Sequence, residues 1–553
     1  NWADAPIEPA TTPDGRPCIT AVPLGDRSVL AAVWRVRIGR VKLYLLDTDL
    51  EENAPWDREL SARLYGGDQE TRIQQEIILG IGGVRALKAL GSKPAAFHLN
   101  EGHAAFVVLQ RVRDLIEQGS TFDQALEVIR ATTVFTTHTP VPAGHDAFPF
   151  QLVEQHLAGC WGTLGANRER FLALGSHDAG AGPQFNMTAL ALRSAGAVNA
   201  VSRLHGEVTR SMWGSMWPGV PESERPVSSI TNGVHMPTWI AGDLADLFSR
   251  HFGADWWDRH DDPALWEAVL GIPGPELWDV RQSLKRYLFA FIRERARQRW
   301  TEEHVGIPRV VAAGTLLDPH ALTLGFARRF AGYKRPELVF HDPERLARLL
   351  NASGRPVQII FAGKSHPADD IGKHHLQRVY KHALDPMFGG RVAFVDDYDL
   401  HVAHFLVQGC DVWLNTPRKP LEASGTSGMK AAINGVPHLS SGDGWWAEGF
   451  NGSNGWVIDG AGAGGNDDAV DAADANALYR LLEEDVVPAY YERDGSGLPQ
   501  RWLAIVKDSI RSVAPRFSAR RMVKEYVERM YAPALERTRS EEVRKSGSQE
   551  VRK

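Results

Sequence analysis

Short apolar runs alternate with helix-like stretches along most of the chain. In the first half the runs cover 95–99, 133–138, 197–201 and 227–231, and the residues between the first two predict a helix over 101–118. In the second half they cover 322–330, 357–363, 391–395, 411–415, 437–441 and 455–459. Parallel strands are buried on both faces and need a crossover connection, so this alternation is typical of a parallel sheet covered by helices. It predicts an α/β chain with two doubly wound, Rossmann-like domains that face each other across a cleft.

The length of 553 residues also requires more than one domain, because a single core stops growing at roughly 250–300 residues. Residues 30–48 predict two strands that turn near Gly39, and Asp68 is placed to cap a helix. The expected division is an N-terminal α/β domain over 1–228, a C-terminal domain over 229–515, a helix over 516–535 that returns to the N-terminal domain, and a charged, disordered tail over 536–553.

Charge and composition narrow the classes of partner. The net charge of −6 argues against nucleic acid or an anionic membrane as the main partner. The chain contains no run that approaches the ~18 apolar residues of a membrane helix. The three cysteines are Cys18, Cys160 and Cys410, and their spacing fits neither a metal site nor a disulfide framework. A reducing, cytoplasmic setting is therefore expected.

Three other patterns resemble ligand-binding or metal-binding motifs but are better explained as ordinary structural features. Residues 460–465 match a dinucleotide glycine pattern, but a polar stretch follows where an apolar helix is needed, so a flexible loop is expected. Residues 362–365 resemble part of a P-loop but lack its earlier glycine. The paired histidines His374–His375 and His401…His404 have no third ligand at a recognisable spacing, so no metal site is predicted.

The densest chemistry lies between Thr416 and Asp443. A buried strand ends at Asn415, and a carboxylate, a loop of small residues and a short helix follow it. Glycine and serine allow the backbone to approach a ligand closely, and the start of a helix offers free N–H groups to an anion. The sequence therefore predicts an anion-binding loop.

Lys430 lies just beyond this loop, and two functions are open to it on chemical grounds. The ammonium group can bind a phosphate as a point charge, or the amine can form an imine with an aldehyde whose phosphate occupies the loop. The residues alone favour neither function.

Several segments together resemble one enzyme family. EASGTSGMK, which contains Lys430, is similar to the pyridoxal-phosphate segment of the glycogen and starch phosphorylases. HLNEGHAAF (98–106), TTHTPVPAGHD (136–146), ITNGVHMPTW (230–239) and RRFAGYKRP (328–336) resemble further family motifs in the same order. The resemblance spans roughly residues 30–531 and is closest in form to the short bacterial and archaeal α-glucan phosphorylases. It implies the two-domain architecture of GT-B glycosyltransferases.

The resemblance implies a role for each matching residue. Lys430 would carry pyridoxal 5'-phosphate, and the residues matching those near the cofactor phosphate are Thr426, Ser427, Gly428 and Arg328. Arg329 and Lys334 match the pair that binds substrate phosphate. Sugar contacts are implied for Asn232, His138, Glu422, Ser424 and Gly425, and Tyr398 is similar to an aromatic residue near the phosphate site.

The implied reaction is phosphorolysis of an α-1,4-glucan such as glycogen, starch or maltodextrin. Inorganic phosphate would remove glucose from the non-reducing end as α-D-glucose 1-phosphate with retention, and the cofactor phosphate would exchange a proton with the substrate phosphate. Glucan and inorganic phosphate are the expected partners. Assembly into a homo-oligomer is a further possibility that the sequence does not decide.

One family feature is not found in the chain. The family has a glycine-rich loop over the cofactor phosphate, which is expected to precede residue 1, so the N-terminal domain is expected to be incomplete. Two alternatives remain at this stage. One is a nucleotide-sugar glucosyltransferase of glycogen-synthase type without pyridoxal phosphate, and the other is an inactive glucan-binding fragment.

Overall fold

The computed structural model describes residues 6–63, 67–141, 144–180, 182–303, 306–367, 369–460 and 466–537. Most of the glycine-rich segment 460–465 and of the charged tail 536–553 lies outside these ranges. The chain divides into two compact units. Unit 1 consists of Asn1–Val201, Gly206–Ser229 and Glu525–Lys553, and unit 2 consists of Ser202–His205 and Ile230–Lys524. Each unit has its own hydrophobic core.

Unit 1 contains the parallel sheet predicted in the first half of the chain. Its strand order is β11-β10-β6-β5, and every neighbouring pair is parallel. The strands are β5 Phe97–Asn100, β6 Thr133–Thr136, β10 Ala197–Ala200 and β11 Ser228–Ser229. The helices that pack with them include α2 Gln69–Ile77, α3 Gly83–Ala89, α4 Val107–Glu117, α5 Phe122–Ala131 and α9 Met187–Ser194. The α/β prediction for this part of the chain is confirmed.

A second, antiparallel sheet in unit 1 contains β1 Ile7–Pro9, β2 Ile19–Leu24, β3 Arg27–Ile38 and β4 Val41–Asp47. Gly39 has a φ of 59° in the turn between β3 and β4, as the sequence predicts. Asp68 caps α2 by accepting the backbone N–H of Thr71, also as predicted.

The predicted helix over 101–118 is wrong at its start. Glu101 has a φ of 67°, a conformation that no α-helix contains, and Gly102–Ala104 form a single 3₁₀ turn. The α-helix begins only at Val107. The Glu101 carboxylate instead accepts hydrogen bonds from the Thr137 hydroxyl and the His138 backbone N–H. These bonds hold the residue at the carboxyl end of the sheet, outside the helix.

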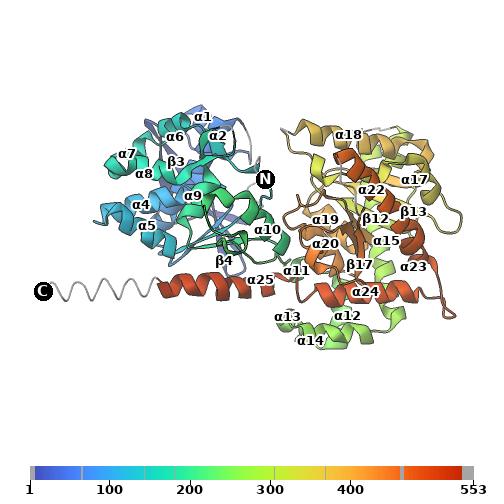
Figure 1. Cartoon of the computed structure of the whole chain (residues 1–553). Coiled ribbons are helices and arrows are strands. Elements are labelled where there is room, and N and C mark those ends of the chain that lie inside the picture. The colour runs from blue at the N-terminus through green and yellow to red at the C-terminus, as the bar shows by residue number, and fades with distance from the viewer. Residues whose placement is uncertain are drawn as a thin grey trace. The chain divides into compact units, whose positions relative to one another are not determined.

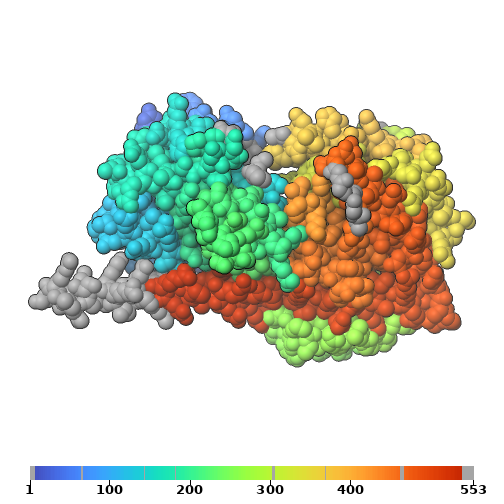
Figure 2. Space-filling view, in the orientation of Figure 1, coloured from blue at the N-terminus to red at the C-terminus, as the bar shows by residue number. Residues whose placement is uncertain are grey.

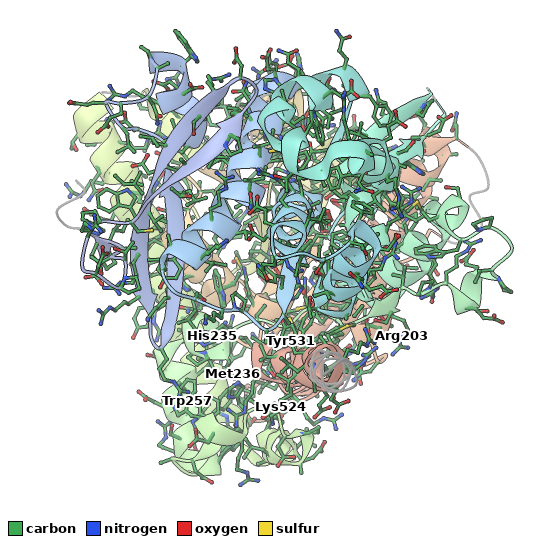
Figure 3. All side chains as sticks on the ribbon, turned by 90° about the vertical axis from the view of Figure 1, so that its left-hand side faces the viewer. Arg203, His235, Met236, Trp257, Lys524 and Tyr531 are labelled. Carbon is green, nitrogen blue, oxygen red and sulfur yellow. The ribbon has the colours of Figure 1, made fainter. Side chains whose placement is uncertain are left out.

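The chain after Glu525 belongs to unit 1. The hydroxyl of Tyr526 accepts a hydrogen bond from Asn199 Nδ2 at 3.0 Å, and the Tyr531 hydroxyl lies 2.7 Å from His98 Nδ1. Figure 2 shows this last segment, in red, on the surface of unit 1, and Figure 3 labels Tyr531. These bonds attach the end of the chain to β5 and β10.

Unit 2 contains a six-stranded parallel sheet of order β14-β13-β12-β15-β16-β17. The strands are β12 Leu322–Ala327, β13 Val357–Ala362, β14 Val392–Val395, β15 Val412–Asn415, β16 His438–Ser441 and β17 Gly455–Ile458. Helices surround the sheet (Figure 1). They include α12 Gly242–Phe252, α15 Gly274–Glu303, α17 Pro343–Leu350, α18 Asp370–Leu384, α19 Leu400–Gly409, α20 Thr426–Ala432, α22 Asp467–Leu481 and α24 Gln500–Val513.

All residues of β12 and β13 are buried, which explains why the sequence shows them as uninterrupted apolar runs. The strand order reverses between β12 and β15, so the loops that follow these strands diverge. In doubly wound sheets a ligand binds at this point. No helix in the described ranges is both long and apolar enough to cross a membrane.

A buried ion pair links the amino-terminal ends of the neighbouring strands β12 and β15. Lys285 on α15 is fully buried, and its Nζ donates to Asp411 Oδ2 and to the Ala321 carbonyl, both at 2.5 Å. Asp411 Oδ2 also accepts the backbone N–H of Thr323 in β12 at 2.8 Å. Burial lowers the pKa of Lys285, but Asp411 and Tyr490 outweigh burial and raise it. Lys285 is therefore charged at neutral pH.

Replacing Lys285 with methionine is expected to destabilise unit 2 by about 3–5 kcal/mol, because the Asp411 charge stays buried without its partner. Urea unfolding measures the change. Lys373→Met is the control, since Lys373 forms an exposed pair with Asp370, and such pairs contribute about 0–1 kcal/mol. Equal losses in the two variants would show that the buried pair has no special role.

Candidate active site

Two of the predicted site's basic residues are buried in the loop that follows β12. Arg328 comes directly after the strand and is 8% exposed, and Lys334 ends a 3₁₀ turn over Gly332–Lys334 and is 7% exposed. Arg329, between them in sequence, is exposed, and no carboxylate in the described part of the chain pairs with it. Two of the three predicted cations are therefore buried at the carboxyl end of the sheet.

Glu422, in the loop after β15, pairs with both buried cations. Lys334 Nζ lies 2.9 Å from Glu422 Oε2, and Arg328 forms a second ion pair with the same oxygen. Burial raises the pKa of Glu422, but Arg328 and Lys334 outweigh burial and lower it to about 2. The carboxylate is thus ionised throughout the neutral range.

The cluster of Arg328, Lys334 and Glu422 has one negative charge too few. Burial and the charge of Arg328 lower the pKa of Lys334 to about 7, although Glu422 acts to raise it. Arg328 Nε and Nη1 are buried and have no hydrogen-bond partner among the described residues. Buried charges without partners are costly, so an anion bound at this cluster would offset them.

This charge balance predicts how anion binding depends on pH. Lys334 is protonated below about pH 7 in the empty site and loses its charge above that value. Sulfate keeps its two negative charges across the neutral range, so its affinity should fall by up to ~10-fold per pH unit above pH 7. The pKa of Glu422 is about 2 and that of Tyr333 is about 12, so neither side chain changes charge there.

Calorimetric titration of sulfate at several pH values tests this prediction. Lys334→Arg is the matched variant, because arginine stays charged at every pH used. Its sulfate affinity should be independent of pH in the same window. A flat profile for the natural protein would contradict the assignment of Lys334 to the anion site.

The small-residue loop and α20 follow Glu422. Gly425 has a φ of 82°, in the left-handed region, where glycine avoids strain. Ser427 Oγ accepts a hydrogen bond from Trp413 Nε1 at 3.1 Å. A Cβ atom on Gly428 would lie 2.6 Å from the His438 ring, so this position has no room for a side chain. The first turn of α20 is therefore held tightly against β15 and β16.

Lys430 on α20 has an unusual environment. Its Nζ lies 3.9 Å from the centre of the Trp239 ring, and no acceptor among the described residues bonds to it. Burial lowers the pKa of Lys430. A partly desolvated amine with a lowered pKa has more of its nucleophilic form, as attachment to a carbonyl group requires.

The other predicted sugar and phosphate contacts in unit 2 lie in separate loops. Ser424 is buried, and its Oγ has no partner among the described residues. Burial raises the pKa of Tyr398 to about 12, although Arg328 acts to lower it. The backbone oxygen of Asn232 accepts a hydrogen bond from Arg521 at 3.4 Å.

His138 is the one predicted site residue in unit 1. It follows β6, its backbone N–H donates to Glu101, and its Nε2 lies 3.1 Å from Asn100 Oδ1. Burial lowers the pKa of His138, so the ring is neutral at pH 7. The remaining predicted residues all lie in unit 2.

Sequence reasoning missed two neighbours of this site. Asp443, after β16, accepts the backbone N–H groups of Glu422 and Gly444, both at 2.8 Å. Burial raises its pKa to about 6. The position of Asp443 directly after a parallel strand could have indicated from sequence that it lies at the site. The sequence does not indicate that Trp239 lies near the site, because only the fold brings it to Lys430.

Comparison with known proteins agrees with this architecture. The family model described as carbohydrate phosphorylase matches residues 82–448. Glycogen phosphorylase of Aquifex aeolicus is 45% identical over 96% of this chain and 76% of its own length. Maltodextrin phosphorylase of Thermococcus litoralis is 48% identical over 97% of this chain and 62% of its own length. Glycogen phosphorylase of Mycobacterium bovis is 45% identical over 96% of this chain, which again spans 62% of the relative.

The chain belongs to the carbohydrate phosphorylase family. This finding confirms the family resemblance that the motifs around Lys430 and Arg328 indicated.

Proposed function

We propose that the protein catalyses phosphorolysis of an α-1,4-glucan, with inorganic phosphate as the second substrate. The buried cluster of Arg328, Lys334 and Glu422 carries the proposal, because its excess positive charge calls for an anion. Membership of the phosphorylase family supports it, as do relatives named glycogen phosphorylase and maltodextrin phosphorylase.

The reaction exchanges one bond at the terminal glucose. The bond from its anomeric carbon to the glycosidic oxygen breaks, and a bond to a phosphate oxygen forms on the same face. The proton of the phosphate passes to the departing oxygen. The products are α-D-glucose 1-phosphate and a glucan shortened by one unit.

The residues of unit 2 divide this work. Arg329 and Lys334 bind the phosphate, and Arg328 offsets the repulsion of neighbouring negative charges. Glu422, ionised at neutral pH, accepts hydrogen bonds from glucose hydroxyls. Ser424 and Gly425 assist it from the same loop. Asn232 and Tyr398 complete the contacts that unit 2 makes to sugar and phosphate, and His138 of unit 1 is proposed as a further sugar contact.

Pyridoxal 5'-phosphate is the proposed cofactor, and the residues fit it. Lys430 is the attachment point, since no acceptor in the described part of the chain bonds to its amine. The Arg328 N–H groups that have no partner among the described residues and the close-packed first turn of α20, Thr426–Gly428, suit its phosphate. When bound, the cofactor phosphate supplies a group that exchanges a proton with the substrate phosphate.

The three buried, free cysteines support the further proposal of a reducing, cytoplasmic setting.

Glucan elongation, the reverse reaction, tests the proposal against a nucleotide-sugar glucosyltransferase. Full-length protein is given a short maltooligosaccharide with either α-glucose 1-phosphate or a nucleotide-linked glucose. Elongation with the sugar phosphate alone is expected. Elongation with the nucleotide sugar alone would refute phosphorolysis.

A further inference from the structure

Arg335 links the loops that form the anion site. It follows Lys334 directly, is 5% exposed, and has a φ of 44°. Its Nε donates to the Thr416 carbonyl at 2.8 Å, and its Nη2 donates to the Pro417 carbonyl at 3.0 Å and to Ser441 Oγ at 3.2 Å. One guanidinium group therefore joins the ends of β12, β15 and β16.

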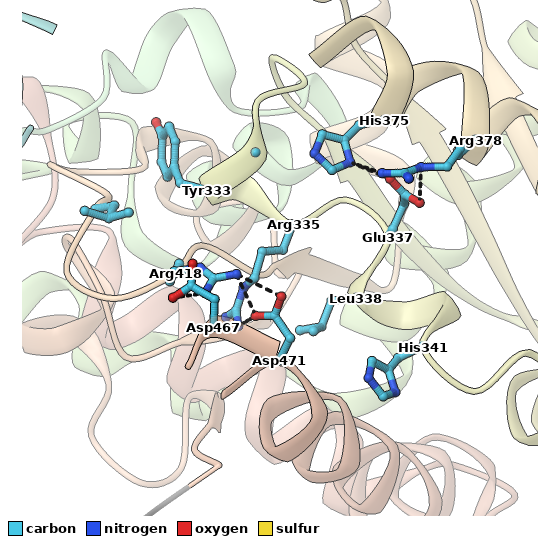
Figure 4. A pocket seen from close by; sticks show the side chains of 12 residues that line it. Tyr333, Arg335, Glu337, Leu338, His341, His375, Arg378, Arg418, Asp467 and Asp471 are labelled. Carbon is cyan, nitrogen blue, oxygen red and sulfur yellow. Dashed lines mark hydrogen bonds and ion pairs between the residues drawn. The ribbon is translucent and has the colours of Figure 1, made fainter. Parts of the chain in front are cut away.

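The outer side of the same guanidinium faces α22. Nη1 lies 2.9 Å from Asp471 Oδ1 and 2.7 Å from Asp474 Oδ2. Arg335, Asp471 and Arg418 line a cavity of about 520 Å³. Figure 4 shows these side chains at its wall. The two aspartates balance the charge of Arg335, so this cation differs from Arg328 and Lys334, which lack enough negative charge.

Thr416, in the loop after β15, also donates a hydrogen bond back to the loop after β12. Its Oγ1 donates to the Lys334 carbonyl at 3.0 Å and lies 2.9 Å from the Arg335 carbonyl. Lys334 and Glu422 form an ion pair across the same two loops. The distance between these two charged groups is thus set by backbone contacts as well as by their own attraction.

We propose that Arg335 is a positioning residue for phosphate. By fixing the loop after β12 to the loop after β15, it holds the paired side chains of Lys334 and Glu422 in the arrangement that binds the anion. Its Nε, Nη1 and Nη2 atoms all contact protein acceptors, so the proposed effect runs through the loops and not through contact with the ligand. The inference rests on the proposed function, since it takes inorganic phosphate as the anion.

A purely structural role for Arg335 makes a different prediction. If only its charge mattered, lysine at this position would satisfy Asp471 and Asp474 and preserve function. If the contacts to the carbonyls matter, lysine fails, because it lacks the planar fork that reaches several acceptors at once. Arg335→Lys therefore separates the two roles without removing the charge.

The test measures binding of inorganic phosphate to the full-length holoenzyme by calorimetry, together with the KM values for phosphate and glucan. Arg335→Lys and Thr416→Val should each weaken phosphate binding by about 10- to 100-fold, the range for residues that orient a ligand-binding group. The KM for phosphate should rise, and the KM for glucan should change far less.

Arg418→Gln is the matched control. Arg418 pairs with Asp467 at 2.6 Å and with Asp471 at 2.8 Å, and among the described residues its side chain forms no hydrogen bond to Thr416 or Pro417. Figure 4 shows it beside Arg335. This variant loses ion pairs to α22 and keeps the contacts between the loops, so its phosphate affinity should stay within about twofold of the natural value.

Three results would overturn the inference. The first is natural phosphate affinity in Thr416→Val and Arg335→Lys, which would leave the proposed function intact. The second is an equal loss in Arg418→Gln, which would assign the effect to the ion pairs with α22. The third is a natural protein that binds no phosphate, which would overturn the proposed function as well. Thr416→Val removes one hydroxyl without changing charge, so it keeps the test decisive if Arg335→Lys folds poorly.

Discussion

Replacing Lys430 with alanine is expected to abolish covalent cofactor binding and to lower phosphorolysis by roughly 10³-fold or more, the scale for deleting a group on which the reacting centre depends. The Lys430 amine rests on the Trp239 ring and has no acceptor among the described residues, so it is available to a carbonyl group. Borohydride reduction followed by peptide mapping should place the cofactor on Lys430 in the natural protein and nowhere in the variant.

Lys507→Ala is the control for this experiment. Burial lowers the pKa of Lys507 as it does that of Lys430, but Lys507 Nζ donates to the carbonyls of Leu270 and Ile272. This variant should keep the cofactor on Lys430 and keep activity. An adduct that maps to any other lysine, or one that survives in Lys430→Ala, would disprove the assignment.

Replacing Arg329 with lysine is expected to lower the phosphorolysis rate by ~10²-fold, as for the loss of a preorganised donor in the transition state. Arg329 is exposed beside a buried cluster that lacks a balancing anion, and no carboxylate among the described residues pairs with it. Arginine can donate two parallel N–H groups to phosphate oxygens, whereas lysine keeps the charge and loses the fork.

Kinetics with phosphate varied at saturating glucan measure this effect. Cofactor content should not change, because Arg328 and Lys430 remain in place. Arg348→Lys, an exposed substitution on α17, controls for the change of residue type in unit 2. If Arg329→Lys keeps both the natural rate and the natural dependence on phosphate, the loop after β12 is an ordinary solvated turn.

The sequence predicted the sheets well because their signal is local. Strands such as β12 and β13 are buried along their whole length, so they appear as unbroken apolar runs. The start of α4 was predicted too early, because Glu101 adopts a positive φ and accepts hydrogen bonds from Thr137 and His138. Those bonds join residues far apart in sequence, and no local pattern reports them.

In the candidate site, too, local motifs were predictable from the sequence and long-range contacts were not. Motifs identified Arg328, Lys334 and Glu422 as residues of one site, but their roles stay predictions. The sequence could not show that Glu422 pairs with both cations, that Trp239 lies under Lys430, or that Arg335 ties the loops together. These contacts depend on the strand order, which places β12 beside β15.

Phosphorus NMR tests the central claim most directly. Full-length protein is incubated with maltoheptaose and inorganic phosphate, and the phosphate-containing products are followed over time. We predict a single new signal from α-glucose 1-phosphate, matched by loss of inorganic phosphate and by a glucan one unit shorter. Shortening of the glucan with no loss of inorganic phosphate, or formation of the β-anomer, would contradict retaining phosphorolysis.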